Sequence, residues 1–113
     1  MRFLLHSKIH KATVTEANLK YIGSITIDEE LMEKAELWPG EKVLVVSNAS
    51  GMRLETYVVA GKRNSGVICM NGAAAYLIKK GEEIIIMGFE LTHKPIKPKM
   101  VLVDKNNKFV KYL

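Results

Sequence analysis

The sequence predicts a mainly β protein, a small closed barrel with short helices. Short apolar runs alternate with turn signals, such as Trp38-Pro39-Gly40 and Asn48-Ala49-Ser50-Gly51, through most of the chain. Only residues 28–35 have a good helix pattern. The 113 residues are 48% hydrophobic, which is enough to fill the interior of one domain spanning residues 1–113.

The sequence of residues 2–35 predicts two strands, a single turn and one helix. Residues 2–14 are extended and rich in β-formers, and 15–19 are expected to form a single turn. Residues 24–27 alternate polar and apolar side chains, which indicates a short strand. Residues 28–35 predict a helix, because Asp28 suits the N-cap and acidic residues fill the first turn.

The rest of the chain predicts strands joined by turns. A short helix is expected within 71–77, and Pro95 and Pro98 place 92–99 on an irregular path. A frayed basic tail is expected at the C-terminus. The predicted strands are 43–46, 53–60, 66–69, 81–87 and 101–103.

The basic charge is concentrated near the C-terminus. The net charge is +5, and residues 90–113 hold six Lys against Glu90 and Asp104, which accounts for +4 of it. Lysines spaced in this way are typical of a solvated edge, so about residues 92–113 form a variable basic segment and no nucleic-acid partner is predicted.

The composition also predicts a location. No apolar run approaches the roughly 20 residues of a membrane span, and the N-terminus lacks a secretory signal, so no membrane partner is expected. The single cysteine, Cys69, cannot form an internal disulfide, which favours a cytoplasmic protein. Its apolar neighbours predict a small core residue.

Several common sites are missing from the sequence. Cys69, His6, His10 and His93 do not have the spacing of a zinc site, so no metal is predicted. Neither a phosphate-binding loop nor a Gly-x-Ser-x-Gly motif occurs.

Polar residues within apolar strands are the remaining candidates. Lys8 and His10 share one face of the first strand, and Arg53 and Glu55 alternate with Leu54. Taken alone, Arg53 and Glu55 are better explained by a half-exposed strand than by a site. The turn at 71–74 has backbone N–H groups that could hold an anion, or it simply begins a helix.

Four segments together resemble the aspartate 1-decarboxylase family, the pyruvoyl-dependent aspartate α-decarboxylases. They occur in the family's order, and the resemblance spans roughly residues 1–90. It implies a double-psi β-barrel, a homotetramer, and self-cleavage between Gly23 and Ser24 into a β chain, 1–23, and an α chain, 24–113. The matching segments are 8–15, 21–24, 51–57 and 71–75.

The chemistry of Gly23-Ser24 agrees with this implication. A serine hydroxyl can attack the carbonyl of the preceding residue, and glycine leaves that carbonyl uncrowded. The resemblance implies Thr56 as the donor to the oxyanion. Elimination and hydrolysis then convert Ser24 to a covalent pyruvoyl group, so neither a metal nor pyridoxal phosphate is needed.

The resemblance also implies the reaction: the α-carboxylate of L-aspartate leaves as CO2, and β-alanine forms for pantothenate biosynthesis. The substrate amine forms a Schiff base with the group derived from Ser24, and Tyr57 donates the proton. His10, Tyr21 and Asn71 are supporting residues. The implied substrate contacts are Lys8, Arg53, Thr56, Gly72, Ala73 and Ala74. Val46-Ser47 stands where some relatives carry a tryptophan beside the site.

Two other hypotheses are compatible with the sequence. One is a non-enzymatic small barrel that binds nucleic acid or a protein partner. The other is a chain that never cleaves, or cleaves only with an unidentified maturation factor. The mass of the purified protein distinguishes them, because only the self-cleaving decarboxylase predicts two chains.

Overall fold

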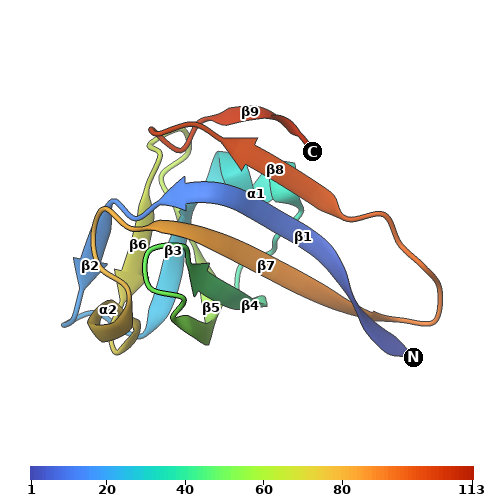
Figure 1. Cartoon of the computed structure of the whole chain (residues 1–113), viewed down its shortest axis with the longest axis horizontal. Coiled ribbons are helices and arrows are strands. Elements are labelled where there is room, and N and C mark those ends of the chain that lie inside the picture. The colour runs from blue at the N-terminus through green and yellow to red at the C-terminus, as the bar shows by residue number, and fades with distance from the viewer.

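A computed structural model describes residues 1–113 as nine strands and two helices (Figure 1). Neither helix combines the length and apolarity that crossing a membrane would require. The helices are α1 (Glu29–Ala35) and α2 (Ala74–Leu77). The strands are β1 (Arg2–Thr13), β2 (Glu16–Asn18), β3 (Ser24–Asp28), β4 (Lys42–Ser47), β5 (Arg53–Gly61), β6 (Ile68–Asn71), β7 (Glu83–Thr92), β8 (Lys99–Val103) and β9 (Phe109–Tyr112).

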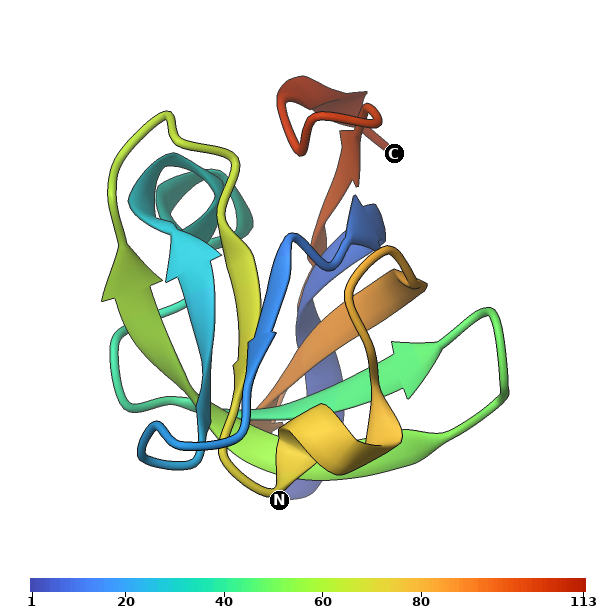
Figure 2. The same cartoon turned by 90° about the vertical axis from the view of Figure 1, so that its left-hand side faces the viewer.

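The strands form one sheet whose order is β2-β6-β3-β5-β4-β7-β1-β8-β9. Only Val14 and Thr15 lie between β1 and β2. Their backbone N–H groups bond to two segments, one beside β7 and one on β6, that are not paired with each other. The Val14 N–H donates to the Glu82 carbonyl beside β7, and the Thr15 N–H donates to the Ile68 carbonyl of β6. The sheet therefore closes on itself, and Figure 2 shows its strands surrounding the interior. The expected mainly β barrel with short helices is confirmed.

The pairing is mixed, which fits the double-psi form of such a barrel. β3 runs parallel to β5 and antiparallel to β6, whereas β1 is antiparallel to β7 and parallel to β8. β1 and β7 run side by side along the molecule (Figure 1). A cluster of 19 buried apolar residues fills the interior, with members from β1, β3–β8 and α1. Its members on β3–β8 alternate in sequence or stand alone, as a two-sided sheet requires, whereas Ile9 and Ala12 of β1 lie three residues apart across a shift in register.

The buried Asp28 carboxylate joins the start of α1 to the β5–β6 loop. One oxygen accepts the backbone N–H groups of Glu30 and Asn64, both at 2.9 Å, and the other accepts that of Gly66 at 2.8 Å. The predicted N-cap is confirmed.

Two predictions of local structure are wrong. Residues 15–19 do not form a turn, because residues 16–18 pair with β6 as β2. The basic tail is not frayed, since β9 pairs with β8. β2 exists through pairing with the distant β6, which no local pattern reveals, whereas β9 pairs with the nearby β8 and the lysines around it indicated a solvated tail instead.

Candidate active site

Ser24 begins β3 directly after an exposed loop. Tyr21 and Ile22 are 54% and 75% exposed, whereas Ser24 is 1% exposed. The Ser24 hydroxyl donates to the Ile22 carbonyl at 3.1 Å. This bond turns Oγ back over the Gly23 peptide, the bond that the resemblance expects to be cut.

Asn71 holds Ser24 from the neighbouring strand. The two residues are register partners, and Asn71 Nδ2 donates to Ser24 Oγ and to Thr26 Oγ1, at 2.9 Å each. Asn71 Oδ1 accepts the thiol of Cys69 at 3.0 Å. Every polar atom of the Asn71 side chain therefore has a partner, so its amide is fixed beside Ser24.

Gly72 packs directly on Gly23. Its φ is +67°, and a Cβ placed there would lie 2.7 Å from Gly23 Cα and 2.9 Å from Gly23 N. Only glycine allows both this conformation and this approach. The Gly72 N–H donates to the Asn18 carbonyl at 2.8 Å, so it is not among the free N–H groups that the sequence predicted for an anion.

Thr56 and Tyr57 lie on the other neighbour of β3. The parallel β3–β5 register begins with Ile25 beside Val58, so Tyr57 and Thr56 directly precede the first paired residue of β5, as Ser24 and Gly23 precede that of β3. Tyr57 is 40% exposed and shares the outward face with Ser24. Thr56 is half-buried on the opposite face of β5. The structure thus gathers Gly23, Ser24, Thr56, Tyr57, Asn71 and Gly72, with Ala73 and Ala74 following directly in the chain.

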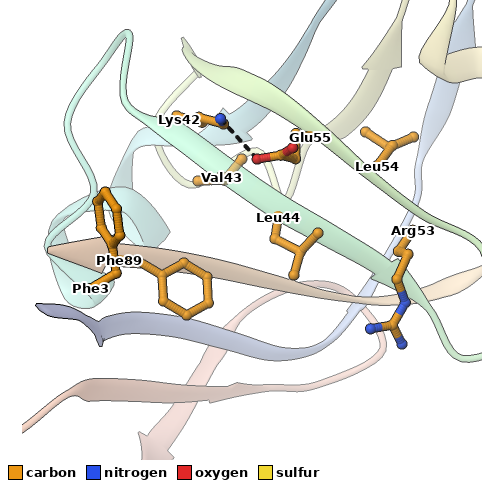
Figure 3. A pocket seen from close by; sticks show the side chains of 8 residues that line it. All are labelled: Phe3, Lys42, Val43, Leu44, Arg53, Leu54, Glu55 and Phe89. Carbon is orange, nitrogen blue, oxygen red and sulfur yellow. Dashed lines mark ion pairs between the residues drawn. The ribbon is translucent and has the colours of Figure 1, made fainter.

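Arg53 lies further along the outward face of β5. It lines a groove of about 660 Å³ whose other walls include Phe3, Leu44 and Phe89. Figure 3 shows Arg53 at one end of this groove, away from the ion pair between Lys42 and Glu55. Ser24 is not part of the groove.

Lys8 and His10 are not brought to Ser24. Lys8 pairs with Met87, Met87 with Leu44, and Leu44 with Glu55, so β4 and β7 separate β1 from β5. Ser24 lies one strand further, on β3, so four strand spacings, about 19 Å along the sheet, separate it from Lys8. Lys8 and Ser24 of one chain are therefore not neighbours in the sheet.

His10 occupies a desolvated, positively charged environment. Burial lowers the pKa of its imidazole below 6.5, and the nearby charges of Lys8 and Lys11 lower it further against the opposing effect of Glu83. Its Nδ1 is buried and without a hydrogen-bond partner.

Two residues of the site were missed by sequence reasoning. Cys69 is buried, as predicted, but it is not a member of the apolar core cluster and faces Asn71 instead. Thr26 shares the face of Ser24 and accepts from the same amide. The i, i+2 spacing of Ser24 with Thr26 and of Cys69 with Asn71 is the signal that could have found them.

The chain is similar in sequence to curated proteins of one family. The family model described as aspartate decarboxylase matches residues 1–110. Curated proteins named aspartate 1-decarboxylase include one from Caldicellulosiruptor saccharolyticus, 58% identical over 96% of this chain and 88% of the relative. Another, from Neisseria meningitidis, is 53% identical over 95% of this chain and 87% of the relative. Among solved structures, the computationally designed protein msDPBB_sym2 matches 77% of this chain and 99% of its own, with 17% identity and a TM-score of 0.47.

Proposed function

Because this chain belongs to the aspartate decarboxylase family and is a carboxy-lyase, we propose that it releases the α-carboxylate of L-aspartate as CO2 and forms β-alanine. We further propose that it first cleaves itself at Gly23-Ser24 and that the product serves pantothenate biosynthesis. The observation that carries the proposal is the buried Ser24 hydroxyl, which donates to the Ile22 carbonyl and is thereby turned back along the chain toward Gly23, one peptide before the bond that it would attack.

The cleavage step uses only groups of this chain. Ser24 Oγ attacks the Gly23 carbonyl carbon, the C–N bond breaks, and the amine of Ser24 takes up the proton, which leaves an ester. Loss of the Ser24 α-proton expels the Gly23 carboxylate, and hydrolysis of the resulting dehydroalanine releases ammonia and leaves the pyruvoyl group. Thr56, level with Gly23 on β5, is the proposed donor to the oxyanion.

The residues around Ser24 fit a pyruvoyl group at that position. The Ser24 side chain is buried, which suits the methyl group that its Cβ would become once Oγ leaves with the Gly23 carboxylate. Asn71 Nδ2, which donates to Oγ in the uncut chain, would then be free to donate to an oxygen of the new group. When formed, the group supplies a ketone that binds the substrate amine and a carbonyl that accepts the electrons of the breaking C–C bond.

The outward face of β5 carries the groups that would handle the substrate. The Tyr57 hydroxyl, in the row of Ser24, would donate a proton to the substrate carbon that loses CO2. Arg53 is four residues away on the same face, about 13 Å of strand. A long guanidinium side chain and a bound aspartate together fill this separation, and the pairing of Arg53 with a carboxylate can be bidentate.

Oligomerisation would complete the site. Lys8 and Ser24 of one chain are not neighbours in the sheet, whereas a second copy could place its own β1 against the outward face of β5. The chain exposes the large apolar side chains Phe3, Phe89 and Leu91 to 72%, 41% and 47%, and clustered exposure of this kind marks an interaction surface. We propose the homotetramer that the resemblance implies.

Intact-mass analysis tests the cleavage. The purified protein should give two chains, 1–23 and 24–113, with a pyruvoyl group at position 24. Ser24→Ala should give one uncut, inactive chain, and Ser50→Ala, a change at an exposed turn, should cleave normally. A full-length chain that still releases CO2 from aspartate would contradict the mechanism.

Co-expression of two inactive variants tests the shared site. Ser24→Ala keeps Lys8, and Lys8→Ala keeps Ser24. Mixed oligomers should regain part of the activity, because some sites then combine an intact Ser24 with an intact Lys8 from another copy. Activity no higher than that of the separate variants would refute sharing.

A further inference from the structure

We propose that Cys69 is a positioning residue for self-cleavage, because its thiol holds the Asn71 amide in the orientation that places the amide nitrogen on Ser24. The inference rests on the proposed function, since it concerns the same cleavage. It gives Cys69 a role in that reaction, whereas the sequence predicted only a small core residue at this position.

The position of Cys69 on β6 separates it from the core. Ile68 and Met70 belong to the apolar cluster, whereas Cys69 and Asn71 alternate with them and face the other side of the strand. Cys69 Sγ lies 3.0 Å from Asn71 Oδ1 and 3.8 Å from the Met70 carbonyl oxygen. The shorter contact identifies the amide oxygen as the main acceptor of the thiol.

An asparagine amide has two orientations that differ by exchange of its oxygen and nitrogen. In the observed one, the nitrogen donates to Ser24 and Thr26 and the oxygen faces the thiol. In the reverse one, the nitrogen would face sulfur, a weak acceptor, and the oxygen would face the two hydroxyls. Cys69 therefore favours the observed orientation, because an S–H group is matched to an oxygen.

The orientation matters for the nucleophile. In the observed arrangement the Ser24 proton is directed to the Ile22 carbonyl, which keeps Oγ against the Gly23 peptide. A carbonyl oxygen of Asn71 facing Ser24 would compete for that proton and draw the hydroxyl away from the bond it attacks. The thiol thus acts on Ser24 through Asn71, without touching the reacting atoms.

The thiol is also suited to donate. Burial raises the pKa of Cys69 above its ordinary value of 9.0, and the carboxylate of Glu16, its register partner on β2, raises it further against the opposing effect of a hydrogen bond from the Asn18 backbone. At neutral pH the sulfur consequently carries its proton, as a donor must.

Cleavage rates of three variants provide the first test. Each chain is pulse-labelled during cell-free synthesis, and loss of the uncut species is followed on denaturing gels. Cys69→Ala, which removes the donor, should cleave about tenfold more slowly. Cys69→Ser, whose hydroxyl can donate to the same oxygen, should remain within about twofold of the wild-type rate.

Ile68→Val is the matched control, because it loses buried volume from the adjacent position on the core side without touching Asn71. It should cleave at the wild-type rate. If Cys69→Ala cleaves as fast as wild type, or if Cys69→Ser is as slow as Cys69→Ala, the inference is wrong. If the wild-type chain never cleaves, the proposed function fails instead, so the two failures are distinguishable.

Infrared spectroscopy tests the hydrogen bond itself and does not depend on cleavage. The chain has one cysteine, so its S–H stretching band has a single source. In the uncut Ser24→Ala protein the band should lie at the lower frequency of a donating thiol. Adding Asn71→Ala should move it to higher frequency, and an unchanged band would overturn the assignment.

Discussion

At the scale of residues, the chain fixes Ser24 through contacts that tolerate little change. Oγ is held by the Ile22 carbonyl and the Asn71 amide, and Gly72 lies against the residue whose carbonyl is to be attacked. Ser24 Oγ is therefore positioned by Ile22 and Asn71, and the Gly23 backbone is positioned by Gly72.

Gly72→Ala is expected to slow cleavage by at least about tenfold, because its Cβ would push Gly23 away from the Ser24 hydroxyl. It should also destabilise the fold by about 1–2 kcal/mol, since alanine is strained at positive φ. The cleaved fraction is measured by mass spectrometry and stability by urea unfolding.

Gly40→Ala is its control. Gly40 has a φ of +84°, and a Cβ added there would meet nothing within 4 Å, so this variant has the backbone strain without the clash. It should lose similar stability and cleave normally. Normal cleavage of Gly72→Ala as well would contradict the role assigned to this contact.

The environment of His10 predicts a pH dependence of stability. Because its pKa is lowered in the folded state, the unfolded chain binds more protons between that value and 6.5. The free energy of unfolding should therefore fall as the pH drops through this window. His10→Gln should reduce the fall between about pH 7.5 and about pH 5.5, and His93→Gln, at an exposed position, should not. An identical pH profile for wild type and His10→Gln would refute the assignment.

At the scale of elements, the β8–β9 hairpin is held by the pairing of β8 with β1 and by one buried side chain in its turn. Asn107 Oδ1 accepts the Thr13 N–H, and its Nδ2 donates to the carbonyls of Thr13 and Gly66, each at 2.8 Å. The residue also adopts a φ of +59°, which asparagine tolerates better than most residues. One side chain thus links three segments that lie far apart in the sequence.

Asn107→Ala should lower the free energy of unfolding by about 3 kcal/mol, because it leaves buried backbone groups unpaired and strains the backbone. Asn107→Gly, which suits the positive φ, isolates the loss of the hydrogen bonds and should cost somewhat less. Asn106→Ala, at an exposed neighbour, should change stability by less than about 0.5 kcal/mol. Equal stability of the Asn106 and Asn107 variants in urea would show that this link is unimportant.

At the scale of the whole molecule, the segment before the cleavage position is an integral part of the barrel. β1 lies between β7 and β8 and contributes Ile9 and Ala12 to the buried core, and β2 pairs with β6. The proposed cleavage interrupts the chain in an exposed loop and leaves this pairing intact.

The two cleaved chains should consequently remain associated in native buffer. Native mass spectrometry should show 1–23 and 24–113 in one particle, and denaturant should separate them. Release of the short chain during gel filtration of the cleaved protein in native buffer would contradict the placement of β1.

Much of this architecture could be predicted from the sequence because its signals are local. The alternation of Ser24 to Ile27, the cap at Asp28 and the turn after Asn48 depend on neighbouring residues, and each has the expected structure. β2 could not be predicted, since it exists through pairing with the distant β6, and β9, the hairpin partner of β8, was obscured by the lysines around it. The Cys69–Asn71 contact was missed although the two residues share one face of β6, because the apolar neighbours of Cys69 indicated a core residue.

Because β1 is part of the sheet, unfolding would be a different reaction for the cleaved protein than for the uncut one. Before cleavage, the strand is tethered to the rest and folding is a reaction of one molecule. Afterwards the same transition separates two molecules, so its midpoint depends on protein concentration and dilution favours the separated chains. Refolding then requires a 23-residue peptide to find its partner by diffusion. A cleaved protein that unfolds is therefore harder to refold than an uncut one, and its lifetime depends on how long it stays folded.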